Sequence, residues 1–169
     1  SERISEMGPC MTGGSMIKTV TTDGSTYQNG HTMFETGTPR IAEAIGWGAA
    51  VEWLSQFEMK DIHNHVHQIA SWTGREMNKI PGIKIYGDPD NKNSSGAVSF
   101  LHETIQSQDL AFLLDEGGFA VRTGHHCAQP LMKRLAVPAT ARISIGCYNT
   151  SEDITKCVTA LKKVVEFFK

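Results

Sequence analysis

The sequence predicts an α/β fold of the α+β sandwich type, in which a small sheet is covered by helices on one side. Two long segments with helical spacing of their apolar residues come first, over 39–56 and 59–79. Short apolar runs then alternate with further helical segments towards the end of the chain. The chain has 169 residues, of which 40% are hydrophobic, and this is enough to form the core of one domain.

Residues 1–36 predict loops and a hairpin that would not fold by themselves. Turn signals recur at Asp23-Gly24 and Asn29-Gly30, and the alternating run 15–21 is a candidate strand. Such a segment buries little apolar area. We therefore expect it to pack poorly, or to pair with another copy through exposed strand edges.

The first long helix is expected to begin at Thr38 as N-cap, with Pro39 as the first helical residue, and to end near Gln56. Its apolar residues are expected to share one face: Ile41, Ala42, Ile45, Ala49 and Trp53. Gly37 and Thr38 could offer free amides and a hydroxyl to an anion such as phosphate. Ordinary helix capping explains the same residues, and the residues alone favour capping.

The second long helix, 59–79, carries three histidines. His63 and His67 are four residues apart and could share a metal ion, but no glutamate follows His63 as in an H-E-x-x-H motif. No second group of cysteine and histidine with metal-ligand spacing accompanies them. We expect no metal site.

Short apolar runs predict the strands of the sheet: Ile83–Tyr86, Ala97–Leu101, Phe119–Val121 and Ala141–Ile145. A helix over 108–115 ends at Gly117-Gly118, which introduces Phe119–Val121 as the central strand. The last helix, 151–168, is expected to begin with a capping box formed by Thr150 and Asp153.

The loop Arg122-Thr-Gly-His-His-Cys127 has the composition of a reactive-cysteine site. Proline at 130 predicts that a helix starts just after the loop, because a first-turn proline costs no intrahelical hydrogen bond. A helix N-terminus and cationic neighbours both stabilise a thiolate, the nucleophilic form of cysteine. The alternative is a cysteine that is a small core residue, and the residues alone leave the two readings evenly balanced.

Composition excludes several classes of protein. The net charge of -2 gives no sign of attraction to nucleic acid or to a membrane surface. No apolar run approaches the length of about 18 residues that a membrane span needs. The first residues are charged and lack the apolar core of a signal peptide. The four cysteines are scattered, which favours free thiols in a reducing compartment, the cytoplasm.

The stretch Val121-Arg-Thr-Gly-His-His-Cys-Ala-Gln-Pro-Leu-Met132 resembles the active-cysteine loop of the Suf-type (group II) cysteine desulfurases and selenocysteine lyases. These are pyridoxal phosphate (PLP) enzymes of the class V aminotransferase family. The resemblance extends in order to Gly13–Ile17, Phe34–Pro39, Ala141–Ser144 and Tyr148–Thr150. It implies the small C-terminal domain of a fold-type I PLP-dependent transferase over 58–169, a connecting helix over 39–57, and a remnant of the large domain over 1–38.

The resemblance implies roles for six residues. Cys127 is the nucleophile that attacks the sulfur of a PLP-bound cysteine, releasing alanine and keeping a persulfide. Arg142 holds the substrate carboxylate, and Arg122 and His126 line the same loop and contact substrate or move protons. Gly37 and Thr38 contact the PLP phosphate of the neighbouring subunit, which implies a homodimer. A sulfur-acceptor protein and iron–sulfur cluster assembly complete the implied function.

The chain also departs from the family. Members are more than twice this long, and the lysine that forms the Schiff base with PLP has no counterpart here. We therefore expect the isolated chain to be inactive. Thr36 stands where the family commonly has alanine, and Arg40 where asparagine is frequent, which weakens the phosphate assignment. The alternatives are a stand-alone sulfur-carrier or docking module without PLP chemistry, and another class V enzyme, whose reaction would need no nucleophilic thiol.

Overall fold

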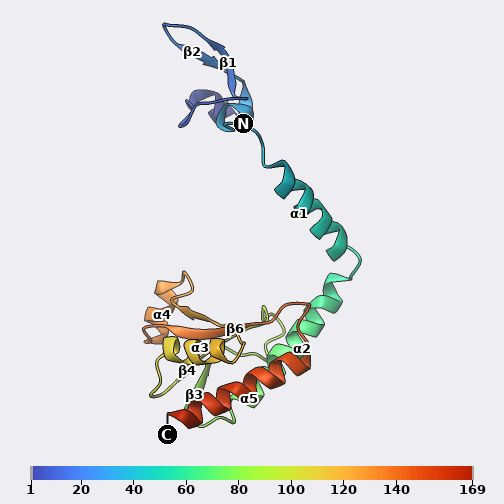
Figure 1. Ribbon diagram of the computed structural model, residues 1–169, viewed down its shortest axis with the longest axis vertical. Coiled ribbons are helices and arrows are strands. Elements are labelled where there is room, and N and C mark those ends of the chain that lie inside the picture. Colours follow the sequence, from blue (N-terminus) through green and yellow to red (C-terminus); the bar gives the residue numbers. More distant parts are fainter. Residues whose placement is uncertain (1, 169) are drawn as a thin grey trace. The chain divides into compact units, whose positions relative to one another are not determined.

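The computed structural model describes residues 2–168, which form two compact units divided between Gln56 and Phe57 (Figure 1). The first unit contains two short 3-10 helices, Glu2–Glu6 and Gly30–Phe34, the strands β1 (Ile17–Val20) and β2 (Ser25–Tyr27), and helix α1 (Ile41–Leu54). The second contains α2 (Met59–Met77), β3 (Ile83–Tyr86), β4 (Ala97–His102), α3 (Ser107–Glu116), β5 (Arg122–Gly124), α4 (Gln129–Leu135), β6 (Thr140–Ser144) and α5 (Ser151–Phe167).

The first unit buries little, as the sequence predicts. Its strands β1 and β2 pair only with each other, in an antiparallel hairpin. Among residues 2–56, Met16 is the single apolar side chain that the structure shows as buried. Apolar residues occur all around α1 rather than on one face, and none of its residues is buried within this chain. Trp47, for example, is 75% exposed.

The start of α1 differs from the prediction. Arg40, not Thr38, is the N-cap, and the first helical hydrogen bond runs from the Ala44 amide to the Arg40 carbonyl at 3.0 Å. The Pro39 carbonyl instead accepts from the Ile41 amide at 2.9 Å. This three-residue turn places Arg40 at φ -75° and ψ 75°, outside the helical region, so the helix begins two residues later than expected.

The second unit is built on one antiparallel sheet in the order β3-β4-β6-β5. Alternate residues of its middle strands are buried: Val98 and Phe100 on β4, and Ala141 and Ile143 on β6. They pack in one cluster with Leu161 of α5 and with apolar residues of α2 and α3. Helices α2, α3 and α5 therefore cover one face of the sheet, which confirms the predicted sandwich (Figure 1).

The prediction of a central strand at Phe119–Val121 is wrong in two respects: the strand begins later in the sequence, and it lies at the edge of the sheet. β5 begins at Arg122, after the apolar run Phe119–Val121, and it is the edge strand beside β6. Phe119 and Val121 are partly buried against the core, so their apolar character reflects packing rather than strand pairing. The turn before them forms as expected, because the amides of Gly118 and Phe119 close the end of α3.

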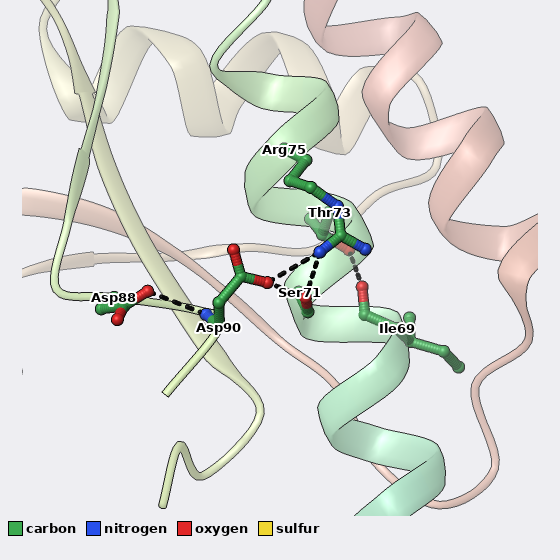
Figure 2. Close-up of polar contacts among 6 residues, drawn as sticks. All are labelled: Ile69, Ser71, Thr73, Arg75, Asp88 and Asp90. Atoms are coloured by element: carbon green, nitrogen blue, oxygen red, sulfur yellow. Dashed lines mark hydrogen bonds and ion pairs between the residues drawn. The ribbon is translucent and has the colours of Figure 1, made fainter. Parts of the chain in front are cut away.

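A charged cluster fastens the loop after β3 to α2 (Figure 2). Nη1 of Arg75 donates to the Ser71 hydroxyl and to the Asp90 carboxylate, each at 2.7 Å. The Ser71 hydroxyl donates to the same carboxylate, and Asp88 accepts a hydrogen bond from the Asp90 amide at 3.0 Å. The cluster holds the segment that follows Tyr86, a residue that lines the cavity described below.

The capping box at the start of α5 forms as predicted. The Thr150 hydroxyl accepts from the Asp153 amide at 3.2 Å, and the Asp153 carboxylate accepts from the Thr150 amide at 2.8 Å. Hydrogen bonds from Thr150 lower the pKa of Asp153. Because the pKa is lowered in the folded state, the stabilisation is present at neutral pH and is lost as pH falls through the lowered pKa.

Thr150→Ala is expected to lower the free energy of unfolding by about 1 kcal/mol, because it leaves the Asp153 amide without its cap. Urea unfolding at neutral pH measures the loss. Thr150→Ser keeps the hydroxyl and is the matched control, for which we expect stability close to that of the unchanged chain. Equal stability of the Ala and Ser variants would show that the Thr150 hydroxyl contributes nothing to stability.

Within residues 2–168, no helix combines the length and the apolar character that crossing a membrane requires.

Candidate active site

Two arginines face each other across β5 and β6. The register of these strands places Arg122 directly opposite Arg142. On the other side of β6, Ser99 of β4 is opposite Arg142. Directly opposed side chains on paired strands point to the same face. The row Ser99, Arg142 and Arg122 therefore lies on the face of the sheet away from the core.

Cys127 lies in a tight turn directly after β5. The Ala128 amide donates to the His125 carbonyl at 2.9 Å, and the two residues between them, His126 and Cys127, have φ of 55° and 58°. A left-handed conformation costs a non-glycine residue about 1–2 kcal/mol, so this turn has to be held by other contacts. The turn leaves Cys127 exposed to solvent.

The cationic group nearest to the thiol comes from β5. Nη2 of Arg122 lies 3.5 Å from Sγ of Cys127. Helix α4 begins at Gln129, with Pro130 in its first turn, so Cys127 precedes a helix as the sequence predicts. A guanidinium N–H at this distance can donate a hydrogen bond to the sulfur.

Two cavities meet at His126. An open depression of about 450 Å³ is lined by Arg122 and Cys127 together with neighbouring residues of the turn. A second cavity of about 410 Å³ lies between the sheet and α4, and Arg142 and Tyr86 are in its wall. His126 lines both. The short helix α4 thus lies beside the sheet face that the other helices leave open.

The imidazole of His126 is tied to the first residue of β6. Its Nε2 lies 3.1 Å from the Thr140 carbonyl oxygen and 2.8 Å from the Thr140 hydroxyl. Burial lowers the pKa of His126, and the positive charges of Arg142 and Arg122 lower it further, against the hydrogen bond to Thr140, which raises it. Nδ1 is buried and has no hydrogen-bond partner among the described residues.

The arginine pair has no neutralising carboxylate. Within the described part of the chain, no ion pair joins Arg122 or Arg142 to an acidic side chain. Nε of Arg142 donates to the Ser144 hydroxyl at 3.0 Å, which orients the guanidinium without neutralising it. Like charges directly opposite each other destabilise a sheet. Two adjacent cations left without counter-charge are suited to binding an anion.

Gly37 and Thr38 belong to the first unit, whereas the other predicted site residues belong to the second. The Gly37 amide, which we expected to face phosphate, donates to the Gly14 carbonyl at 2.8 Å. Thr38 is exposed, and neither its amide nor its hydroxyl has a hydrogen-bond partner among residues 2–168. The amide and the hydroxyl that stay unpaired at this position are therefore those of Thr38.

The cysteines and histidines form no metal centre in the described residues, which contain no group of three candidate ligands. The rings of His63 and His67 stack with centroids 6.1 Å apart, and Nε2 of His63 lies 2.8 Å from the Lys92 carbonyl oxygen. All four cysteines are free. Burial raises the pKa of the Cys157 thiol to about 11, which leaves that thiol unreactive at neutral pH.

The sequence reasoning missed Ser99, Tyr86, Thr140 and Ser144, which surround Arg142 and His126. In β6 the polar residues Thr140, Arg142 and Ser144 alternate with apolar ones, and in β4 Ser99 lies between Val98 and Phe100, so this alternation could have indicated an accessible sheet face. No signal in the sequence pairs Thr140 with His126, because their contact depends on how the turn folds back on β6.

Comparison with known proteins gives one consistent match. The class V aminotransferase family model matches residues 1–157. A probable cysteine desulfurase from Staphylococcus aureus is 41% identical over 167 residues, which are 99% of this chain and 40% of the relative. The chain therefore spans about 40% of the length of the curated relatives it matches.

Solved structures agree. The crystal structure of the cysteine desulfurase CsdA from Escherichia coli matches with a TM-score of 0.84 and 33% identity, covering 98% of this chain and 41% of that one. The apo cysteine desulfurase from Thermococcus onnurineus matches with a TM-score of 0.83 and 30% identity, covering 98% and 41%.

Proposed function

The chain belongs to the class V aminotransferase family, and we propose that it is part of a Suf-type cysteine desulfurase. The complete enzyme uses pyridoxal phosphate and transfers sulfur from L-cysteine to Cys127. The observation that carries the proposal is the cross-strand pair of Arg122 and Arg142 beside that thiol. Arg142 suits the carboxylate of an amino acid, and Arg122 suits an anionic sulfur.

Arg142 is the residue for the substrate carboxylate. Its guanidinium lines the cavity between the sheet and α4, has no acidic partner there, and is oriented by Ser144. An arginine fork can hold a carboxylate through two parallel charge-assisted hydrogen bonds. Such a pair fixes the orientation of a small amino acid relative to Cys127, which lies beside the neighbouring Arg122.

Cys127 is the sulfur nucleophile. Its thiolate attacks the sulfur atom of the bound cysteine, an S–S bond forms, and the C–S bond of the substrate breaks. The bonding electrons stay with the carbon fragment, which takes up a proton and leaves as alanine, and the transferred sulfur remains on Cys127 as a persulfide. Arg122, 3.5 Å from Sγ, stabilises negative charge on the sulfur before and after the transfer.

The residues present fit the cofactor only in part. PLP supplies the electron sink that makes the substrate C–S bond labile. The free amide and hydroxyl of Thr38 are suited to a phosphate contact, at a dimer interface of the complete enzyme. No lysine lines either cavity within the described residues, so the Schiff-base residue has to come from another part of the enzyme.

The outer sulfur of a persulfide on an exposed cysteine can be passed to another thiol. The partner in this proposal is therefore a sulfur-acceptor protein. The transferred sulfur serves iron–sulfur cluster assembly in the cytoplasm. A second candidate is a stand-alone sulfur carrier that accepts persulfide at Cys127. Among the described residues no lysine lines either cavity, which suits a carrier, because a carrier needs the thiol and Arg122 but no PLP chemistry.

The charge pairing can be tested by alkylating Cys127 with iodoacetate, an anion, and with neutral iodoacetamide. We expect the ratio of the two rate constants to be higher at Cys127 than at exposed Cys10. Arg122→Gln should lower the Cys127 ratio by about 5-fold, since one partly exposed charge contributes about 1 kcal/mol at this range. Mass spectrometry of the chain measures each site separately.

Arg134→Gln is the matched control, because it removes an equal charge from α4 at a residue that lines neither cavity. It should leave the ratio unchanged. Equal ratios at Cys127 and Cys10 in the unmodified chain would contradict the proposed function.

A further inference from the structure

The imidazole of His126, which the family resemblance implies contacts substrate or moves protons, is hydrogen-bonded within the chain. A carbonyl oxygen can only accept, so Nε2 carries the proton and donates to Thr140. The Thr140 hydroxyl, 2.8 Å from the same nitrogen, shares that proton. Nδ1 is then an unprotonated nitrogen, and it is buried from solvent.

The backbone of His126 is held in an unfavourable conformation. It is followed by Cys127, and both have left-handed φ angles, 55° and 58°. Two such residues in succession are disfavoured unless neighbouring contacts over-determine the turn. Besides the turn's own bond from the Ala128 amide to the His125 carbonyl, the turn contacts the sheet through the hydrogen bonds of His126 to Thr140 and of Arg122 to Cys127.

We propose that His126 is a positioning residue, which holds the Cys127 turn against β6 so that the thiol stays beside Arg122. This inference rests on the proposed function, because it assumes that the pairing of Cys127 with Arg122 matters. Thr140, the hydrogen-bond partner of His126, is fully buried and starts the strand that carries Arg142. The hydrogen bonds between His126 and Thr140 thus fix Cys127 relative to both arginines.

Protonation of His126 would destabilise the arrangement in which its imidazole donates to Thr140. A second proton would have to sit on Nδ1, which has no acceptor within the described residues, and the resulting cation would face Arg122, Arg142 and His125. The lowered pKa of His126 agrees with this, so the neutral form that donates to Thr140 persists at neutral pH.

Two substitutions distinguish the effect of the His126–Thr140 hydrogen bonds from the effect of the backbone conformation at residue 126. His126→Asn keeps a residue that tolerates the left-handed region well, but its side chain is too short to reach Thr140. His126→Gln places an amide donor at the position of Nε2 and can keep the hydrogen bond. The test measures the iodoacetate-to-iodoacetamide ratio at Cys127 of the full chain, with Cys10 as internal reference and urea unfolding as a check on stability.

We expect His126→Asn to lower the Cys127 ratio by about 5-fold, to the level of Arg122→Gln, because the thiol leaves the guanidinium. His126→Gln should restore most of the ratio. Because unfolding would also separate Cys127 from Arg122 and lower the ratio, the ratio is measured only under conditions where urea unfolding shows that the variant is folded. An unchanged ratio in His126→Asn, with the preference intact in the parent chain, would overturn this inference alone. Absence of any preference in the parent chain would overturn the proposed charge pairing and this inference with it.

Discussion

Mixed with PLP and L-cysteine, the 169-residue chain is expected to release no sulfide above the level of free PLP. PLP chemistry needs a lysine placed to hold the cofactor and move protons. Within residues 2–168 no lysine lines the cavities at Cys127 and Arg142, and Lys18, Lys60 and Lys84 are all exposed on other elements. The expected effect is a complete loss of sulfide release relative to a full-length cysteine desulfurase.

Sulfide release over time measures this, with free PLP and L-cysteine as the background and the full-length Staphylococcus aureus relative as the active comparison. The Cys127→Ser variant shows whether any excess depends on the thiol. Turnover that scales with the amount of chain and disappears in Cys127→Ser would refute the expected inactivity. Sulfide that also appears with Cys127→Ser would point to cofactor chemistry elsewhere.

Phe100→Ala is expected to destabilise the second unit by about 3–5 kcal/mol, a large fraction of the stability of a domain this size. Phe100 is 0% exposed at the middle of β4 and packs in the cluster that joins the sheet to its helices. Truncation removes apolar contacts and leaves a cavity that the neighbouring helices fill only in part. The first unit has no residue in this cluster and should be unaffected.

Alkylation of Cys157 reports the unfolding. This thiol is buried on α5, and its pKa of about 11 keeps it protonated and protected at neutral pH in the folded state. It should become reactive at a lower urea concentration in Phe100→Ala. Phe112→Ala is the control, since Phe112 is 65% exposed on α3. If both variants exposed Cys157 at the same urea concentration, the core assignment of Phe100 would be wrong.

The elements that periodicity and local chemistry define were predictable. The long helix α2, the end of α3 at Gly117-Gly118 and the capping box of Thr150 and Asp153 follow from interactions within a few residues of chain. The start of α1 was predicted at the wrong residue, because a tight turn centred on Arg40 holds that residue outside the helical region. The strand at Phe119–Val121 was predicted wrongly, because an apolar run shows burial but does not reveal whether a partner strand lies beside it.

Residue types and their order are local information, so the family resemblance and the candidate residues Cys127 and Arg142 could be predicted from the sequence. Three features required the folded chain: Arg122 lies opposite Arg142, His126 is hydrogen-bonded to Thr140, and the Gly37 amide is hydrogen-bonded to the Gly14 carbonyl. Each of these depends on strand register or on a contact between distant residues. Such contacts are set by how the whole unit packs, which no short stretch of sequence specifies.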